Sequence, residues 1–314
     1  MSIFSSNYRS SMLRFLQLVR VVIASKIRCC RLYALLLLFC MCTAVAAEAY
    51  PQVLVQHRTE SDGTERLLTP VARYKDPAGR IVDLVGAVHL ADAAYYRNLN
   101  RAFASRYDKV LYEMVDGEGL PEYLRLARKV QLGTATAEEK ERYAALAAGA
   151  QAGGTNILGK YYEFMSRTLQ LTLQTERIDY SLENMVFADM SSAEFSRAMA
   201  ERGESWLTIA LQSLAEDQGS VSSFAFSRSS LRRELIRALA ASASGTSGAL
   251  QQGAIIISRN EKCFAVLDTQ LASAPAGTRI AIFYGAMHLR DMHYRLLARG
   301  FSLQGVQWLT AIRG

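Results

Sequence analysis

The sequence predicts an α/β fold with a central mixed sheet, built from two pseudo-repeated strand-GxxH-helix halves with an all-helical insertion between them. Residues 86–99 (GAVHLADAAYYRNL) and 285–297 (GAMHLRDMHYRLL) share one sequence motif, and each has a histidine at its fourth position. An apolar run typical of a buried strand precedes each copy of this motif. The residues between the copies are rich in Ala, Leu, Glu and Arg at helical spacing. These observations favour one sheet assembled from both ends of the chain.

The first 47 residues read as a secretory signal peptide. Basic residues without any acidic one precede an apolar stretch from Leu32 to Ala47, and small residues follow around Thr43–Ala49. That order is typical of a cleaved leader. The apolar stretch is shorter than the roughly 20 residues that cross a bilayer. We therefore predict an exported protein, periplasmic or secreted. The alternative is an uncleaved N-terminal segment that anchors the chain to the membrane.

Without this segment, the net charge and the number of cysteines of the remaining chain lead to different conclusions. The pI of about 9.2 reflects the basic leader, because Lys+Arg and Asp+Glu nearly balance in residues 48–314. The sequence thus gives no electrostatic reason to expect nucleic acid as a partner. Cys263 is the one cysteine after the leader, so no intramolecular disulfide is expected. We predict Cys263 to be a small buried apolar residue.

Residues 51–116 predict strands and one helix. Two strand-like runs flank Asp76-Pro77-Ala78-Gly79, which is a strong turn signal. Asp92 is placed to cap a helix that runs to about Arg106. The apolar run Lys109–Val115 then predicts a second buried strand with Glu113 inside it.

The rest of the chain divides into the insertion and a second α/β segment. Residues 118–250 predict helices broken by glycine-rich and serine-rich stretches. Residues 251–314 predict a helix, a strand, a helix closed by Gly300 and a last strand. Their expected bounds are Arg259–Ala274, Ile280–Tyr284, Asp291–Arg299 and Val306–Thr310.

Three side chains form the candidate catalytic and metal-binding set. His89 and His288 each follow the carboxyl end of a predicted strand, where α/β sheets build their sites. Glu113 lies in an apolar strand, and a buried carboxylate needs a partner, which a metal can supply. Two imidazoles and one carboxylate leave coordination positions open for water and substrate, as catalytic sites do. The donors suit Zn, Mn, Co or Fe, and the residues do not choose among these.

Four neighbouring residues are candidate supporting groups. Gly86 and Gly285, three residues before each histidine, would allow a close backbone approach or a turn of the strand end. Asp92 and Asp291, three residues after, would cap the following helix or orient the imidazole.

The same residues also have ordinary structural interpretations. A histidine after a strand is usually a structural residue, although a matched pair weakens that interpretation. Glu113 alone would more often be the partner of a cation, and Arg259 is the candidate. His57 is interpreted as a surface residue and His293 as a residue on a helix face. No HExxH, GxSxG or paired-cysteine zinc motif is present.

At these residues the chain resembles the TraB/GumN family, which includes TIKI-type metalloproteases. The matching elements are Gly86-Ala87-Val88-His89, Glu113 and Gly285-Ala286-Met287-His288, with Arg259-Asn260 and the Ile178–Ser191 region as further likenesses. The resemblance implies a single domain over residues 48–314 and His89, Glu113 and His288 as the metal or catalytic set. It favours Mn or Co as the metal, with Arg259 as a supporting charge and Asp189 as a residue matched in some family members.

Three functions compete at this stage. The first is an exported metal-dependent hydrolase, peptidase-like, acting on a peptide or small molecule. The second is a protein of the same fold that binds or sequesters peptides without cleaving them. The third is an interaction role in which apolar helical faces, such as Tyr161–Leu173 and Trp206–Leu214, contact a partner. The sequence does not identify the substrate or the oligomeric state.

Overall fold

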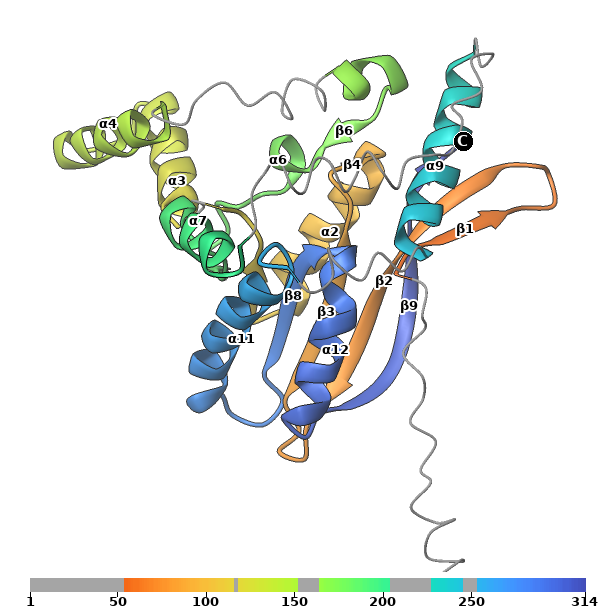
Figure 1. Cartoon of the computed structure of the whole chain (residues 1–314). Helices are drawn as coiled ribbons and strands as arrows, with labels where there is room; N and C mark the ends of the chain where they lie inside the picture. Colours follow the sequence, from red (N-terminus) through yellow and green to blue (C-terminus); the bar gives the residue numbers. More distant parts are fainter. Residues whose placement is uncertain (1–53, 116–117, 152–163, 204–226, 245–252) are drawn as a thin grey trace, which may run out of the picture. The chain divides into compact units, whose positions relative to one another are not determined.

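The computed structural model describes residues 54–115, 118–151, 164–203, 227–244 and 253–314 (Figure 1). All of them belong to one compact unit, Tyr50–Gly314. The leader or anchor expected over residues 1–47 and the apolar stretch at 206–214 lie outside the described residues. Within the described part of the chain, no helix has the length and apolar character needed to cross a membrane.

A seven-stranded mixed sheet with helices around it confirms the predicted α/β class. The strands follow the order β1-β2-β3-β8-β5-β7, and β9 pairs with β2. Their bounds are β1 Gln56–Thr59, β2 Glu65–Lys75, β3 Ile81–Ala87, β5 Lys109–Tyr112, β7 Met185–Phe187, β8 Arg279–Gly285 and β9 Ser302–Arg313.

The hairpin between β2 and β3 forms where the turn signal predicts it. Gly79 has a φ of +86°, a conformation that glycine adopts without strain. The backbone N–H of Arg80 donates to Asp76 Oδ1 at 2.8 Å, which closes the turn. The two strands pair antiparallel from Val71↔Val85 to Lys75↔Ile81.

Four neighbouring strands of this sheet run parallel. β3 pairs with β8, β8 pairs with β5 and β5 pairs with β7, each in the parallel sense. Strands from both ends of the chain therefore lie next to one another, and their carboxyl ends meet at one edge of the sheet. In open α/β sheets this is the edge where ligands bind.

Helices cover both faces of these parallel strands. Consecutive side chains of a strand point to opposite faces. Phe283 of β8 packs against Phe103 of α2 (Ala93–Arg106), with ring centroids 5.1 Å apart. Its neighbour Tyr284 lies on the side of α11 (Ile257–Ala272) and α12 (Leu289–Ala298), with its ring centroid 5.2 Å from that of His288. Figure 1 shows α11 and α12 in front of β3 and β8.

The insertion between the two halves is not all-helical, and that prediction was wrong. It contributes α3 Leu120–Gln131, α4 Ala137–Gln151, α6 Gln174–Arg177, α7 Ser192–Glu201 and α9 Arg228–Ser244. However, β7 extends the central sheet next to β5, and the two-residue strand β6 (Thr172–Leu173) pairs with β4 (Leu90–Ala91). Strands of two or three residues are too short to produce a detectable alternation, so pattern alone does not reveal them.

Candidate active site

Each of the four parallel strands delivers a polar side chain just after its carboxyl end. His89 follows β3, and His288 follows β8 by one 3₁₀ turn, Ala286–His288. Glu113 was predicted inside its strand, but β5 ends at Tyr112, so Glu113 follows it. Asp189 follows β7 in the same way. The sheet order places these strand ends side by side, although their residues come from both ends of the chain and from the insertion.

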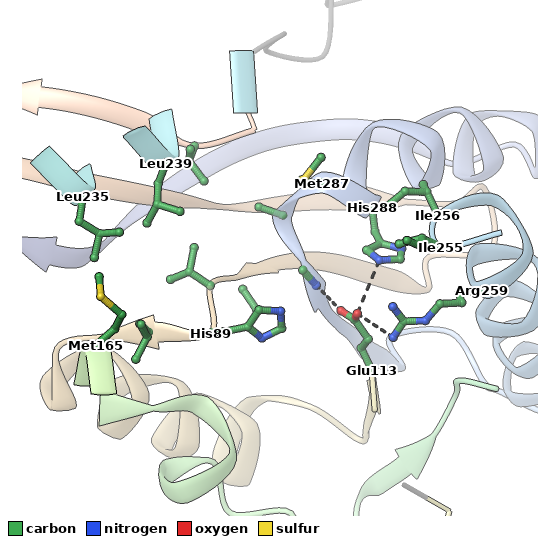
Figure 2. A pocket seen from close by; sticks show the side chains of 16 residues that line it. His89, Glu113, Met165, Leu235, Leu239, Ile255, Ile256, Arg259, Met287 and His288 are labelled. Atoms are coloured by element: carbon green, nitrogen blue, oxygen red, sulfur yellow. Dashed lines mark hydrogen bonds and ion pairs between the residues drawn. The ribbon is translucent and has the colours of Figure 1, made fainter. Parts of the chain in front are cut away.

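A cavity of about 460 Å³ opens at this edge, and His89, Glu113, Arg259 and His288 all line it. Figure 2 shows Glu113 between the two imidazoles, with His89 on one side and His288 on the other. The structure therefore brings the three predicted side chains to a common pocket. Its volume falls in the range of ordinary small-ligand sites, about 300–1,000 Å³.

Both carboxylate oxygens of Glu113 are engaged. Oε1 lies 2.7 Å from Nη2 of Arg259, and Oε2 accepts the backbone N–H of Gly285 at 2.5 Å. Burial alone would raise the pKa of Glu113, but positive charge at His288 when protonated, Arg259 and His89, with the Gly285 N–H, brings that pKa down to about 2. Glu113 is therefore an ionised carboxylate at neutral pH.

Arg259 holds two carboxylates at once. Its Nε and Nη2 donate to the two oxygens of Asp189 at 2.9 and 2.6 Å, and Nη2 also contacts Glu113. The side chain of Asp189 is fully buried and that of Arg259 is 11 % exposed. Burial lowers the pKa of Arg259, but the two carboxylates outweigh it and raise the pKa above its usual value. The predicted pairing of Glu113 with Arg259 is thus confirmed.

Asn260 fixes the ring of His288. The amide Nδ2 of Asn260 donates to the carbonyl of His288 and to Asp291 Oδ2, at 3.1 and 2.8 Å. Its Oδ1 then faces Nδ1 of the imidazole at 2.7 Å. Because this oxygen can only accept, Nδ1 carries the proton and Nε2 keeps its lone pair. Burial lowers the pKa of His288 to about 4, so the ring is neutral at pH 7.

Two electron-rich atoms consequently face each other in the cavity. Nε2 of His288 lies 3.6 Å from Oε1 of Glu113, and neither atom has a proton to donate to the other. Two ligands of one tetrahedral Zn-type ion, each at about 2.1 Å, would lie about 3.4 Å apart. The chemistry and spacing of this pair therefore fit a divalent cation.

The third predicted ligand is less closely placed. His89 is exposed, and its ring faces Glu113 from the side of the cavity opposite His288 (Figure 2). In the described ranges, no three His, Cys, Asp or Glu side chains are grouped tightly enough to coordinate one ion as they stand. His89 would complete a ligand set with Glu113 and His288 only after its ring moves.

The two glycines of the repeated motif are required for different steric reasons. A Cβ on Gly86 would lie 2.9 Å from Cδ of Pro70, so this position requires glycine for packing between strands. A Cβ on Gly285 would lie 3.3 Å from Oε2 of Glu113. Glycine at 285 thus lets the carboxylate approach the backbone N–H that binds it.

The two aspartates do not cap helices with their side chains, contrary to the simpler prediction. Asp92 occupies the N-cap position of α2, but its carboxylate accepts from Arg232 Nη2 at 2.5 Å and from the N–H of Arg313 at 2.9 Å. Asp291 lies inside α12 and binds Asn260 and Arg295. The predicted orienting role is indirect at Asp291, because Asn260 stands between it and the imidazole.

The remaining histidines and Cys263 lie outside the cavity lining. His57 is exposed as expected and lies 2.8 Å from Glu65. His293 is on α12 but is only 4 % exposed, with Nδ1 2.8 Å from the hydroxyl of Tyr74. Cys263 is buried as predicted, and burial raises the pKa of its thiol well above the usual value.

The sequence alone does not identify Asn260 as the partner of the His288 ring, and it connects Asp189 to the site only through the family resemblance. A usable signal existed for Asp189, because it follows a short apolar run as Glu113 does. Asn260 contacts His288 only because α11 packs on α12, and no local sequence pattern encodes that packing. The chain matches no protein-family model, no curated protein and no solved structure.

Proposed function

We propose that this protein is an exported metal-dependent hydrolase, peptidase-like, with His89, Glu113 and His288 as the metal-binding and catalytic set. The observation that carries the proposal is the pair formed by Glu113 and His288. An ionised carboxylate and the lone pair of a neutral imidazole face each other at 3.6 Å in a cavity, and a cation between them would bind Nε2 of His288 and a further lone pair of Oε1 of Glu113. The pseudo-repeat of the two GxxH units is part of this proposal.

The metal would be held by Nε2 of His288 and the carboxylate of Glu113, with His89 as the third ligand. When bound, a divalent ion lowers the pKa of a water molecule toward neutrality and polarises a carbonyl. Mn or Co is the first choice by the family resemblance, and Zn is also suited to these donors.

The chain's own residues have distinct tasks in this proposal. Glu113 is a poor general base, because a carboxylate with a pKa of about 2 takes up a proton weakly at neutral pH. Arg259 and the N–H of Gly285 keep its carboxylate oriented and ionised. Asn260 holds His288 in the tautomer that presents Nε2 to the cavity. In the net reaction, the oxygen of water bonds to the acyl carbon, the C–N bond breaks, and a proton from water leaves with the amine.

A non-catalytic peptide-binding protein is the second candidate. The cavity favours it to the extent that most of its lining is apolar, which suits binding whether or not a bond is cleaved. The two candidates differ in their need for metal. A hydrolase requires the ion for turnover, whereas a binding protein keeps its affinity for peptide without it.

Metal content tests the proposal directly. The purified chain is loaded with Mn, Co or Zn, desalted and analysed by mass spectrometry, beside His89→Ala, Glu113→Gln and His288→Ala. We expect bound metal in the wild type, loss of it in these variants, and cleavage of a diverse peptide library only with metal. His57→Ala is the matched control, because His57 is exposed and does not line the cavity. Equal metal content in His57→Ala and His288→Ala would contradict the proposal.

A milder variant examines the orientation of the imidazole. Asn260→Ala removes the acceptor of the Nδ1 proton but leaves all three proposed ligands in place. Partners of this kind typically affect metal affinity by about 10–100-fold. We therefore expect metal affinity, measured by competition with a chelating dye, to fall within that range. An unchanged affinity would show that the His288 ring needs no such support.

Export is part of the proposal and has its own test. N-terminal sequencing of the protein recovered from its natural host distinguishes a cleaved leader near residue 47 from an intact anchor. An intact N-terminus in the membrane fraction would favour the membrane-anchored alternative over cleavage and export.

A further inference from the structure

The cavity combines one polar centre with apolar walls on both sides of it. Figure 2 shows Met165, Leu235 and Leu239 on the side of His89, and Ile255 and Ile256 on the side of His288. All five line the same cavity as Glu113. A ligand that fills this space has a polar group at its middle and apolar groups beside it.

The apolar wall beside His89 comes from elements that are far apart in the sequence. Leu235 and Leu239 lie one turn apart on α9, which packs on β2, and Met165 belongs to a helical segment at residues 164–169. These three side chains are partly buried against the core. Their remaining apolar surface faces the cavity, where an apolar ligand would remove it from water.

We propose that the substrate of this site is a peptide in which large aliphatic side chains flank the scissile amide. This inference rests on the proposed function for the position of the scissile bond. The amide would lie at the polar centre formed by His89, Glu113 and His288. One neighbouring side chain would pack against Leu235 and Leu239, and the other against Ile255 and Ile256.

The apolar walls on both sides of a polar centre disfavour two other substrate classes. A highly charged ligand would place its charges against Leu, Ile and Met side chains, which cannot solvate them. A uniformly apolar ligand such as an acyl chain would remove the polar centre of the cavity from water without offering a polar group to it. A peptide meets both requirements, because its backbone amide is polar and the side chains on either side of that amide can be apolar.

Binding measurements test the inference without requiring cleavage. Two fluorescein-labelled hexapeptides are compared that differ only at the third and fourth positions, with Leu-Leu in one and Asn-Asn in the other. Leucine and asparagine have similar shapes, so the pair isolates polarity. Fluorescence anisotropy on the full chain in the presence of a chelator gives each Kd, and mass spectrometry verifies that the peptide stays intact; cleavage is followed separately after Mn, Co or Zn is added.

We expect the Leu-Leu peptide to bind at least about tenfold more tightly than the Asn-Asn peptide, a typical discrimination for an apolar pocket. Leu235→Ala and Leu239→Ala should reduce this preference. Leu231→Ala is the matched control, since Leu231 is on the same helix, is 37 % exposed and does not line the cavity. It should leave the preference unchanged.

The outcomes separate this inference from the proposed function. Equal affinity for the two peptides, or no binding of either, overturns the inference even if the protein cleaves other peptides. A clear Leu-Leu preference without any cleavage keeps the inference for binding and contradicts the hydrolase. Because the wild-type ratio requires no variant, the test holds even if Leu235→Ala fails to fold.

Discussion

Arg259→Met provides the sharpest test of the electrostatics at the site. Methionine keeps an unbranched side chain but removes the guanidinium shared by Glu113 and Asp189. Both carboxylates are then left with little solvent, because the side chain of Glu113 is 12 % exposed and that of Asp189 is fully buried. Breaking a buried ion pair by removing one partner costs about 3–5 kcal/mol. Protonation of one carboxyl in the variant limits the cost, because two like charges in one site do not both remain ionised.

Thermal unfolding followed by far-UV circular dichroism measures this cost. For a domain of this size, 1 kcal/mol corresponds to about 2–4 °C in Tm, so the variant should melt roughly 6–20 °C below the wild type. Arg142→Met is the matched control, because Arg142 forms a bidentate pair with Glu122 but both side chains are exposed. Surface pairs contribute about 0–1 kcal/mol. If Arg259→Met melts as Arg142→Met does, the buried cluster does not stabilise the fold as argued.

Two further predictions concern the contacts around Glu113 and α9. Gly285→Ala places a Cβ 3.3 Å from Oε2 of Glu113, so the carboxylate must shift by a few tenths of an ångström. We expect a weaker metal affinity, measured by chelator competition, and a Tm within a few degrees of the wild type. A retained metal affinity would contradict this prediction. Arg237→Gln removes the cation whose hydrogen bond holds the pKa of Glu65 below its usual value. A depressed folded-state pKa stabilises the fold above the unfolded value of about 4.3, and this contribution is lost as the pH falls. The Tm gap between wild type and Arg237→Gln should therefore be present at neutral pH and close in acid, and a gap that widens in acid would refute the assignment.

The parts of the fold that the sequence predicts are those with strong local signals. The turn at Asp76–Gly79, the strand before each histidine and the helix ended before Gly300 all follow from residue type and spacing. His89 and His288 were expected near each other because each follows a predicted strand, and the cavity does contain both; Glu113 was expected inside its strand and joins them at a strand end. The sequence thus predicts which polar side chains lie close to the ends of strands.

The network behind those side chains was not predictable in the same way. Asp92 occupies a helix N-cap position, which pattern recognises, but its carboxylate binds Arg232 and the backbone of Arg313, which lie far away in the sequence. The short strand β7 gives no alternation, so its place beside β5 and the burial of Asp189 were missed. These features depend on long-range packing, and a single sequence carries no direct record of it.

The buried charges at the site do not balance, and this imbalance has a chemical consequence. Glu113 and Asp189 are two carboxylates, Arg259 is the cation between them, and His288 is neutral at pH 7 because burial lowers its pKa to about 4. These fixed charges sum to one net negative charge, so the cluster attracts one more positive charge to the cavity. Protonation of Glu113 is a poor solution, because its pKa of about 2 keeps it ionised. A cation bound between Glu113 and the lone pair of His288 removes the imbalance without moving Arg259 from Asp189. In the proposed function, the same residues that make Glu113 a weak base would therefore make it a good metal ligand.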